Sequence, residues 1–276
     1  MSTPNADETI LSNPKALRVR RAAALARKKE RVAQARFLVE GPQAVRELLV
    51  HRPELAETVY ATLGAVSWQH EIDRLASDAE VRLERVSDEV LAAVSETVHP
   101  QGVVAVARTW STPVSEAVRG ARLVAVLHEV RDPGNAGAVL RAADAAGADA
   151  VVFAGESIDP FHPKVVRSTT GSLFHLPVVV SGGLDELAGE LRQAGLTLLA
   201  ADVRGDDLLG ARSEGVLAGA VAWIFGNEAR GLSAQDRALA DRSLKLPIFG
   251  AAESLNLATA ASVILYETAF AQRRDA

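Results

Sequence analysis

The strongest constraint on the fold is a regular alternation of apolar runs and helix-like segments, which begins near Arg122 and continues to the C-terminus. Each apolar run has the length of a buried strand, and most are followed by a stretch of helical periodicity. Such alternation favours a parallel sheet covered by helices on both faces. We therefore predict an α/β domain over residues 121–276. Its predicted strands are 123–130, 150–153, 196–201, 221–225 and 243–246, its predicted helices are 138–147, 184–194, 233–240 and 255–273, and a turn is predicted at 132–137.

A smaller α/β pattern occupies the N-terminal part of the chain, whose length of 276 residues favours two modest domains. We predict a domain over 1–108 with a disordered start (1–13), and then a polar linker over 109–120 that is punctuated by Pro and Gly. Residues 15–35 have a helical composition. The other predicted strands are 37–41, 57–61, 81–86 and 102–107, and the other predicted helices are 43–51, 69–78 and 88–95.

Composition excludes several classes of protein. No apolar run reaches the roughly 18 uncharged residues that a helix needs to cross a bilayer, and the N-terminus lacks the apolar core of a signal peptide. The absence of cysteine excludes disulfides and thiolate metal sites, and the six histidines lack the close spacing of a zinc site. We therefore expect no metal centre and a cytoplasmic protein.

Charge is distributed unevenly along a chain whose formal net charge is −5. Residues 14–36 hold nine basic residues and one acidic residue, so a basic arm precedes an acidic body. This asymmetry indicates a polyanionic partner contacted mainly from the N-terminal end, although a solvated helix would have the same composition. The candidate contacts in the arm are Arg20, Arg21, Arg27, Lys28 and Lys29.

Two strand–loop–helix junctions bring polar side chains to the ends of apolar strands. In WIFGNEARGL (223–232), an amide and the carboxylate of Glu228 follow the strand directly. In LKLPIFGAAESLNLATAASVILYE (244–267), Ser254 is a suitable N-cap for the last helix, and Asn256 lies in the expected first turn. Because open parallel sheets bind ligands beyond the carboxyl ends of their strands, the two junctions together predict one polar pocket.

The segment DPGNAGAVLRAADAAGAD (132–149) has the place of a dinucleotide-binding loop but lacks the GxGxxG pattern, which argues against a nucleotide-dependent dehydrogenase. Its chemically useful residues are Asn135 in the turn and Arg141 about two helical turns later. A spacing of six residues places them on different faces of a helix, so their roles are expected to differ. Arg141 could equally be a surface residue paired with Asp144.

HPKVVRSTTGSLFHLPV (162–178) combines cations and hydroxyls around Gly171, a combination suited to phosphate oxygens. A capped, polar helix end would show the same residues. The candidate phosphate contacts are Lys164, Arg167, Ser168 and Ser172.

Taken in order, the motifs at 132–149, 223–232 and 244–267 resemble those of the SpoU (TrmH-type) family of S-adenosylmethionine-dependent RNA ribose 2′-O-methyltransferases, in the SPOUT superfamily. Each motif alone is weakly specific, whereas the ordered set is specific. FLVEGPQAVRELL (37–49) and VHPQGVVAVA (98–107) resemble the family's N-terminal substrate-binding domain, which is similar to a small RNA-binding ribosomal protein. The matching residues are Asp132, Pro133, Asn135, Gly137 and Arg141 in the first motif, Phe225, Gly226, Glu228, Gly231 and Leu232 in the second, and Leu246, Pro247, Ser254, Leu255 and Asn256 in the third.

The resemblance implies features that the patterns do not show. These are a deep trefoil knot in the C-terminal domain, a homodimer whose sites draw on both protomers, and S-adenosylmethionine held largely by backbone atoms without a metal. In the family an arginine, here Arg141, activates the ribose hydroxyl, and it is expected to act either as a general base or as an electrostatic clamp. The implied cofactor contacts are Ala200, Gly226, Leu246 and Leu255, and the implied catalytic residues are Arg141, Asn135, Glu228, Ser254 and Asn256.

The implied activity is methyl transfer to a ribose 2′-hydroxyl, and the sizeable N-terminal domain favours large-subunit (23S) ribosomal RNA as the substrate. Two alternatives stay open, namely methylation of a tRNA loop and a non-catalytic RNA-binding protein built from the same modules. The intact catalytic set argues against the second alternative, because a protein that only binds RNA does not need it. RNA and a second copy of the chain are the expected partners.

Overall fold

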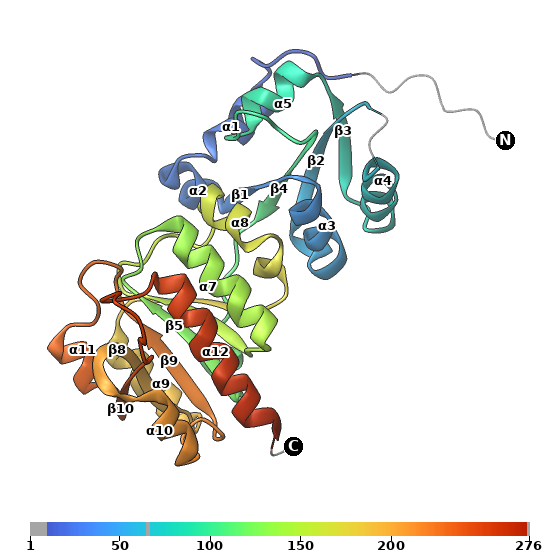
Figure 1. Ribbon diagram of the computed structural model, residues 1–276. Helices are drawn as coiled ribbons and strands as arrows, with labels where there is room; N and C mark the ends of the chain where they lie inside the picture. The colour runs from blue at the N-terminus through green and yellow to red at the C-terminus, as the bar shows by residue number, and fades with distance from the viewer. Residues whose placement is uncertain (1–9, 65–66, 275–276) are drawn as a thin grey trace. The chain divides into compact units, whose positions relative to one another are not determined.

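The computed structural model of the chain describes residues 10–64 and 67–274, drawn in Figure 1. Contacts divide the chain into two units. The N-terminal unit comprises the described residues up to Thr109 together with Phe161–Phe174, and the C-terminal unit comprises Trp110–Pro160 and the described residues from His175 onward.

The N-terminal unit is built on a mixed sheet with the strand order β1-β4-β2-β3. Strand β4 runs antiparallel to β1 and β2, and β3 runs parallel to β2. The strands are β1 (Arg36–Glu40), β2 (Ala56–Thr62), β3 (Arg82–Val86) and β4 (Val103–Arg108). The helices that precede β4 are α1 (Leu17–Ala24), α2 (Lys28–Gln34), α3 (Pro42–His51), the 3-10 turn η1 (Pro53–Leu55), α4 (Gln69–Asp78) and α5 (Asp88–Val94). The predicted strands and helices between residues 37 and 107 are confirmed, and the helical segment 15–35 forms two helices.

The start of the described chain adds to the edge of this sheet. Leu11 N–H donates to the Arg85 carbonyl (2.9 Å), and Ser87 N–H donates to the Leu11 carbonyl (3.1 Å), which forms a parallel bridge beside β3. The prediction of disorder is therefore wrong for 10–13, because the outer strand offers backbone groups that this segment satisfies. Residues 1–9 of the predicted disordered segment lie outside the described residues.

The segment Phe161–Phe174 lies between β6 and β7 in sequence but packs within the N-terminal unit. It contains α8 (Pro163–Thr169) and η2 (Ser172–Phe174). Phe161 and Phe174 lie against Phe37 of β1, with ring centroids 4.8 and 6.5 Å from the Phe37 centroid. The predicted domain range 121–276 is therefore wrong over this segment, because its apolar ends are buried against β1.

The C-terminal unit is built, over the described residues, on a six-stranded sheet in which all neighbouring strands are parallel, as predicted. The strand order is β10-β8-β9-β5-β6-β7. The strands are β5 (Leu123–His128), β6 (Ala150–Ala154), β7 (Val178–Ser181), β8 (Thr197–Asp207), β9 (Val221–Phe225) and β10 (Arg242–Lys245). The helices are α6 (Val114–Ala117), α7 (Pro133–Ala146), α9 (Leu184–Gln193), α10 (Leu208–Ser213), α11 (Ala234–Ala238) and α12 (Leu257–Arg274).

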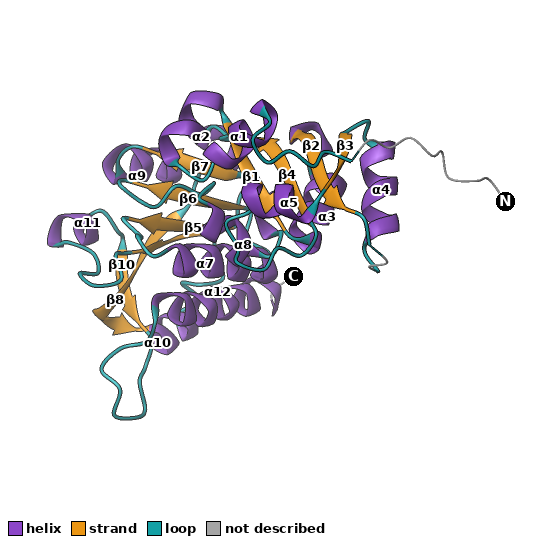
Figure 2. Ribbon diagram, turned by 90° about the horizontal axis from the view of Figure 1, so that it is seen from above, coloured by secondary structure: helices purple, strands orange, loops and turns teal. Residues whose placement is uncertain are grey.

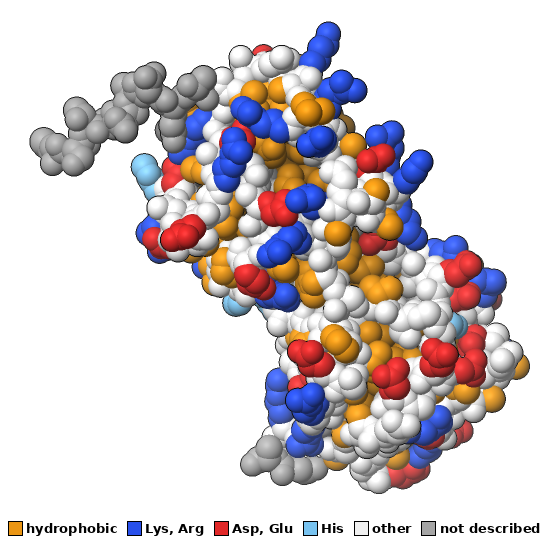
Figure 3. All heavy atoms as spheres, turned by 180° about the vertical axis from the view of Figure 1, so that it is seen from behind, with side chains coloured by type: hydrophobic (Ala, Val, Ile, Leu, Met, Phe, Trp, Pro, Cys, Tyr) orange, Lys and Arg blue, Asp and Glu red, His pale blue; other side chains and the backbone are white. Residues whose placement is uncertain are grey.

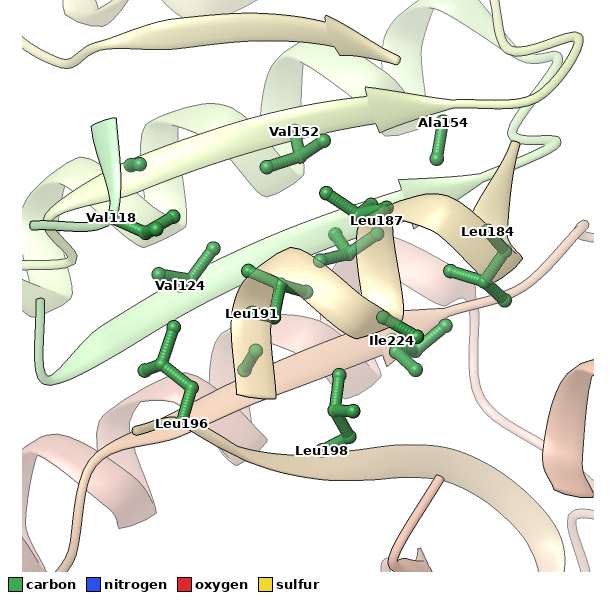
Figure 4. Close-up of a cluster of buried hydrophobic side chains, with 14 of the residues drawn as sticks. Val118, Val124, Val152, Ala154, Leu184, Leu187, Leu191, Leu196, Leu198 and Ile224 are labelled. Atoms are coloured by element: carbon green, nitrogen blue, oxygen red, sulfur yellow. The ribbon is translucent and has the colours of Figure 1, made fainter. Parts of the chain in front are cut away.

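Helices cover both faces of this sheet, with α9 on one face and α7 and α12 on the other (Figure 2). On the first face, Val124 and Ile224 of the central strands pack in one cluster with Leu187 of α9 (Figure 4). On the second face, the indole N–H of Trp223 donates to the Thr268 hydroxyl of α12 (2.9 Å), and both residues are fully buried. Among the described residues, no helix is long and apolar enough to cross a membrane.

The predicted linker 109–120 is not a free connection. Residues 114–117 form α6, and Ala117 and Val118 are buried in the same apolar cluster as α9. The Thr112 N–H also donates to the Val178 carbonyl at the start of β7 (2.9 Å). The linker prediction is therefore wrong from Trp110 onward, because these apolar side chains complete the core of the C-terminal unit.

Three further boundaries differ from the predictions. The predicted turn at 132–137 is the first turn of α7, because Asp132 caps the helix by accepting a hydrogen bond from Asn135 N–H (2.7 Å) and Pro133 follows the cap. Strand β8 extends six residues beyond its predicted end, and the short elements β7 and α10 were not predicted. The last helix begins at Leu257.

The order of strands identifies where a ligand can bind. The chain runs from β5 outward to β6 and β7, and it then crosses to the other side of β5 to form β8, β9 and β10. The order reverses between β5 and β9, and the carboxyl ends of these two strands diverge into different connections. A crevice at this switch point is the usual ligand site of open parallel sheets.

Candidate active site

Glu228 joins the carboxyl end of β9 to the start of α7. One of its carboxylate oxygens accepts hydrogen bonds from Asp132 N–H (3.0 Å) and from the Asn135 side-chain amide (3.3 Å), and the other accepts one from Arg131 N–H (3.2 Å). The helix dipole and the unpaired N–H groups of a first turn favour a negative charge at this end of α7. The carboxylate therefore ties together the two sides of the switch point.

Asn135 continues this network to the last helix. The side-chain amide of Asn256 donates to Asn135 Oδ1 (2.9 Å), while Asn256 Oδ1 accepts hydrogen bonds from Ala258 N–H (2.9 Å) and Thr259 N–H (3.3 Å). Asn256 is thus the cap of α12, and the prediction of Ser254 as the cap is wrong because the helix starts three residues later. Glu228, Asn135 and Asn256 form one hydrogen-bonded chain through all three motifs.

A cavity of about 450 Å³ lies beside Glu228. It is enclosed by the ends of β8, β9 and β10, by the loop after β9 and by the start of α12. Its volume lies in the range of small-molecule sites, and its lining mixes apolar with polar side chains. The predicted site residues that line it are Gly226, Glu228, Leu246, Ser254 and Leu255.

Gly226 shapes the wall of this cavity at the end of β9. A Cβ at this position would lie 2.7 Å from the Gly231 carbonyl carbon and 2.8 Å from the Leu232 nitrogen, so no larger residue fits. The loop folds back at this point, and Gly231 N–H donates to the Asn227 carbonyl (2.8 Å). The glycine therefore allows the tight loop that carries Glu228.

Asp202, in the middle of β8, lines the cavity as a second polar residue that the sequence analysis missed. Its buried carboxylate accepts two hydrogen bonds from the Arg204 guanidinium (3.0 Å each) and one from Arg204 N–H (2.8 Å), with Arg237 Nη1 at 3.5 Å. Burial raises the pKa of Asp202, but the hydrogen bonds to Arg204 and the charges of both arginines outweigh it, so the pKa lies below its ordinary value. The signal that could have found Asp202 is that it directly follows the apolar run 196–201, much as Glu228 follows the apolar run 221–225.

Two predicted site residues do not reach the cavity. Ala200 is completely buried in the apolar cluster on the α9 side of the sheet, and the next residue, Ala201, lines the cavity instead. Successive side chains of a strand face opposite sides, so the Ala200 side chain points away from the cavity, and its contact with the cofactor stays a prediction. Arg141 lies exposed on α7 and is not among the residues that line the cavity.

Some residues of the predicted phosphate site at 162–178 have partners within the protein. Arg167 Nη1 pairs with the buried carboxylate of Glu40 (3.0 Å), and the Ser168 hydroxyl donates to the Val165 carbonyl (2.9 Å). Ser172 is buried, and only Lys164 of the predicted set is exposed. The Arg167–Glu40 pair therefore joins this segment to β1 of the N-terminal unit, whereas the Ser168 hydroxyl bonds within the segment itself. The four residues stay predicted RNA contacts.

The basic arm presents most of its charges to solvent. Arg20 and Arg21 on α1 are exposed, as are Arg27, Lys28 and Lys29 at the start of α2. Arg31 differs, because its buried guanidinium donates to the carbonyls of Leu25 (3.0 Å) and Ala26 (2.8 Å) after α1. Figure 3 shows many Lys and Arg side chains on the surface of the chain as seen from behind.

Comparison with known sequences identifies the family of this chain. The sequence pattern described as the SpoU rRNA Methylase family matches residues 122–266, and that described as the MRM3-like substrate binding domain matches residues 16–105. The chain belongs to the SpoU rRNA methylase family. Glu228, Asn135 and Asn256, at which the three motifs of this SpoU protein meet, all lie within the first match.

Individual relatives of this SpoU protein align over most of its length. The 23S rRNA (guanosine(2553)-2′-O)-methyltransferase RlmP of Bacillus subtilis is 34% identical over 87% of this chain and 90% of its own. The 23S rRNA (uridine(2479)-2′-O)-methyltransferase of Streptomyces viridochromogenes is 31% identical over 89% of this chain and 86% of its own. The crystal structure of the SpoU methyltransferase AviRb from Streptomyces viridochromogenes in complex with the cofactor AdoMet superposes with a TM-score of 0.81 at 29% identity, covering 94% of this chain and all of that one.

Proposed function

We propose that this protein transfers a methyl group from S-adenosylmethionine to a ribose 2′-hydroxyl of 23S ribosomal RNA, at the cavity beside Glu228. The observation that carries the proposal is the hydrogen-bonded chain of Glu228, Asn135 and Asn256, which joins the three motifs at the switch point of the sheet. The relatives from Bacillus subtilis and Streptomyces viridochromogenes, which align over most of this chain, are 2′-O-methyltransferases of 23S rRNA.

The cavity suits S-adenosylmethionine in size and lining. Leu246 and Leu255 offer apolar surface to a flat base, and Gly226, which has no side chain, adds backbone to the lining. When bound, S-adenosylmethionine supplies an electrophilic methyl group.

The residues around the cavity would act on the ribose. A 2′-hydroxyl is barely ionised at pH 7, so the site has to hold the oxygen in place and stabilise the negative charge that develops on it. We assign this stabilisation to Arg141, whose guanidinium stays protonated and is suited to grip the 2′-oxygen and a neighbouring phosphate. Both Glu228 oxygens already accept hydrogen bonds from the chain, so we assign Glu228 a positioning role and leave proton acceptance to the phosphate.

We propose that Arg141 acts in the site of a second copy of the chain. On α12, the side chains of Val263, Tyr266 and Phe270 form an apolar stripe that is 38–49% exposed, whereas Ile264 and Leu265 are buried. The Tyr266 hydroxyl donates to the Ala145 carbonyl (3.3 Å), and this carbonyl lies one helical turn beyond Arg141. A homodimer that buries this stripe would bring Arg141 close to the partner subunit.

Subunit exchange tests the shared site. Arg141→Ala should abolish methyl transfer and leave the affinity for S-adenosylmethionine within about threefold, because its partners are ribose and phosphate. Leu255→Arg should block the cavity. Mixing the two inactive variants should restore activity, since each heterodimer contains one intact site. If exchange is confirmed and the mixture stays inactive, each site is built within one chain.

We further propose the trefoil knot of this family and a cytoplasmic reaction. After β9 the chain forms β10 beside β8, and it then crosses back to pack α12 on α7, which is a path compatible with threading. The cytoplasmic location follows from the proposed substrate, since the ribosomes of a bacterial cell are in its cytoplasm. The N-terminal unit, with its exposed basic arm, is the proposed RNA-binding part.

The direct test of the activity uses radiolabelled S-adenosylmethionine and separated RNA fractions. The protein should label unmodified 23S rRNA and leave purified tRNA unlabelled. The modified position can be mapped because a 2′-O-methyl group protects the adjacent phosphodiester from alkaline hydrolysis. If only tRNA is labelled, the substrate is tRNA and not 23S rRNA. If neither fraction is labelled, the proposed activity is refuted.

A further inference from the structure

Phe249 is the large apolar side chain that is most exposed among the described residues. Its side chain is 91% exposed, and it lies in the loop between β10 and α12, directly after Ile248, which lines the cofactor cavity. Ser254 and Leu255, later in the same loop, line the cavity too. An exposed aromatic ring beside a cavity is available to stack against a ligand.

The charges around the same cavity indicate the class of that ligand. Arg204, Arg230 and Lys245 line the cavity, and the first two have side chains that are 60% and 69% exposed. The carboxylates on the lining are those of Asp202 and Glu228, and protein donors already engage both of them. Arg204 pairs with Asp202 and Arg230 pairs with Glu129, but both guanidinium groups keep N–H donors for a further anion. Exposed cations beside an exposed aromatic ring are the combination that binds single-stranded nucleic acid, since the cations meet phosphates while a base stacks on the ring.

We propose that Phe249 is the stacking platform for a base of the RNA substrate, either the base of the methylated nucleotide or the one next to it. This inference rests on the proposed RNA methylation. The ring would hold the nucleotide in the unstacked state that exposes its ribose to the cavity. Phe249 is then a substrate-binding residue that positions the 2′-hydroxyl, supplied by a loop whose other residues form the cofactor cavity.

The test compares Phe249→Ala with Phe249→Trp on an unmodified 23S rRNA transcript. Because a base–aromatic stack contributes about 5- to 150-fold in affinity, Phe249→Ala should lower kcat/KM by about that factor. Phe249→Trp should stay within about threefold of the wild type, and its fluorescence should change on addition of RNA. The affinity for S-adenosylmethionine should stay within about twofold in both variants. Val180→Ala, a change at an exposed apolar residue of β7, should leave kcat/KM unaltered.

A synthetic RNA fragment sharpens the test once the methylated position is mapped. Fragments that lack the base at the target or at either neighbour should remove the difference between the wild type and Phe249→Ala at one of these positions. If all fragments keep the difference, or if Phe249→Ala methylates the transcript like the wild type, the stacking role is refuted. The wild-type rate in the same assay tests the proposed activity separately.

Two other ligands of Phe249 give distinct outcomes. If a second copy of the chain covers the ring, Phe249→Ala should dissociate the dimer in light scattering, as Phe270→Ala on the exposed stripe of α12 is expected to do. If the cofactor covers it, the affinity for S-adenosylmethionine should fall in the absence of RNA. Either result would overturn the proposal.

Discussion

Glu40 in the N-terminal unit and Glu228 in the C-terminal unit both gather several hydrogen-bond donors, but in different surroundings. The Glu40 side chain is 4% exposed and accepts hydrogen bonds from Ser95, Thr97 and Arg167, among others. Glu228 is exposed, accepts three hydrogen bonds and borders a cavity. A buried network mainly holds segments together, whereas one at the rim of a cavity can also orient a ligand.

The largest expected effect on stability belongs to Glu40. Glu40→Ala should lower the free energy of unfolding of the N-terminal unit by about 3 kcal/mol, because it leaves backbone donors unpaired and removes the partner of Arg167. This is the lower end of the range for buried pairs, since Arg167 is 27% exposed. Denaturant unfolding and titration with S-adenosylmethionine check the prediction. A simultaneous loss of cofactor affinity would contradict the division between the two networks.

Glu228→Ala should have the opposite profile. It should lower kcat about 100-fold, because Asn135 and Asn256 lose the group that orients them, while the free energy of unfolding changes by less than about 1 kcal/mol at this exposed position. Single-turnover methylation and thermal unfolding measure the two quantities. Glu228→Gln is the matched control, and it should recover only part of the rate because an amide presents one acceptor oxygen where the carboxylate presents two. If Glu228→Ala lowers the free energy of unfolding as much as Glu40→Ala does, the two glutamates do not differ in their structural role.

Asp202 combines features of both glutamates, because its carboxylate is buried like that of Glu40 and lines the cavity beside Glu228. Its pKa is lower in the folded protein than in the unfolded chain, so it stabilises the fold above the unfolded value of about 3.9, and this stabilisation is lost as the pH falls through the folded value. Asp202→Asn should therefore cost about 1.5 kcal/mol at pH 7 and nothing at a pH below both values. Unfolding free energies of both proteins across this range are the measurement. If the two proteins differ in unfolding free energy by the same amount in acid as at pH 7, the charge of Asp202 does not contribute to stability.

The smallest effect concerns the exposed arm. Replacing Arg27, Lys28 and Lys29 by Ala should reduce the slope of log K for RNA against log salt by up to about two units, at roughly 0.7 per phosphate contact with a single strand. The fold should be unaffected, because the three side chains are exposed. Arg31→Ala is the contrast, since it should destabilise the helical arm by removing the cap on the Leu25 and Ala26 carbonyls. If the slope is unchanged in the triple variant, these three residues do not contact phosphates and the arm is only a solvated helix.

The strands and helices of both units could be predicted because their signals are local. Strand β9 (Val221–Phe225) and helix α4 (Gln69–Asp78) have the predicted bounds. An apolar run and a helical period are patterns of neighbouring residues, so both can be recognised in the sequence. The helix starts were less predictable. Asp132 and Asn256 cap α7 and α12 with their side-chain oxygens. From the sequence, several neighbouring polar residues could equally have been the cap.

The site could be predicted only in part, for the same reason. Gly226, Glu228 and Leu246 follow the ends of β9 and β10, and the rule that ligands bind at the carboxyl edge of a parallel sheet places such residues together. Asp202 was missed because β8 continues past its predicted end. The sequence could not predict that the Ala201 side chain, rather than that of Ala200, lines the cavity, because a fully apolar strand does not show which of its faces is which.

By itself, the sequence determined the class of fold, the three motifs and the family, because periodicity and ordered spacing are properties of the linear chain. Only the tertiary structure decided which partner each polar residue has. In the structure Arg167 forms an ion pair with Glu40, and Arg31 donates to a carbonyl at the end of α1. Hydrogen bonds also link Glu228 through Asn135 to Asn256. The physical reason is that a charge takes its role from the donors, acceptors and water around it, and residues far apart in the chain supply those surroundings.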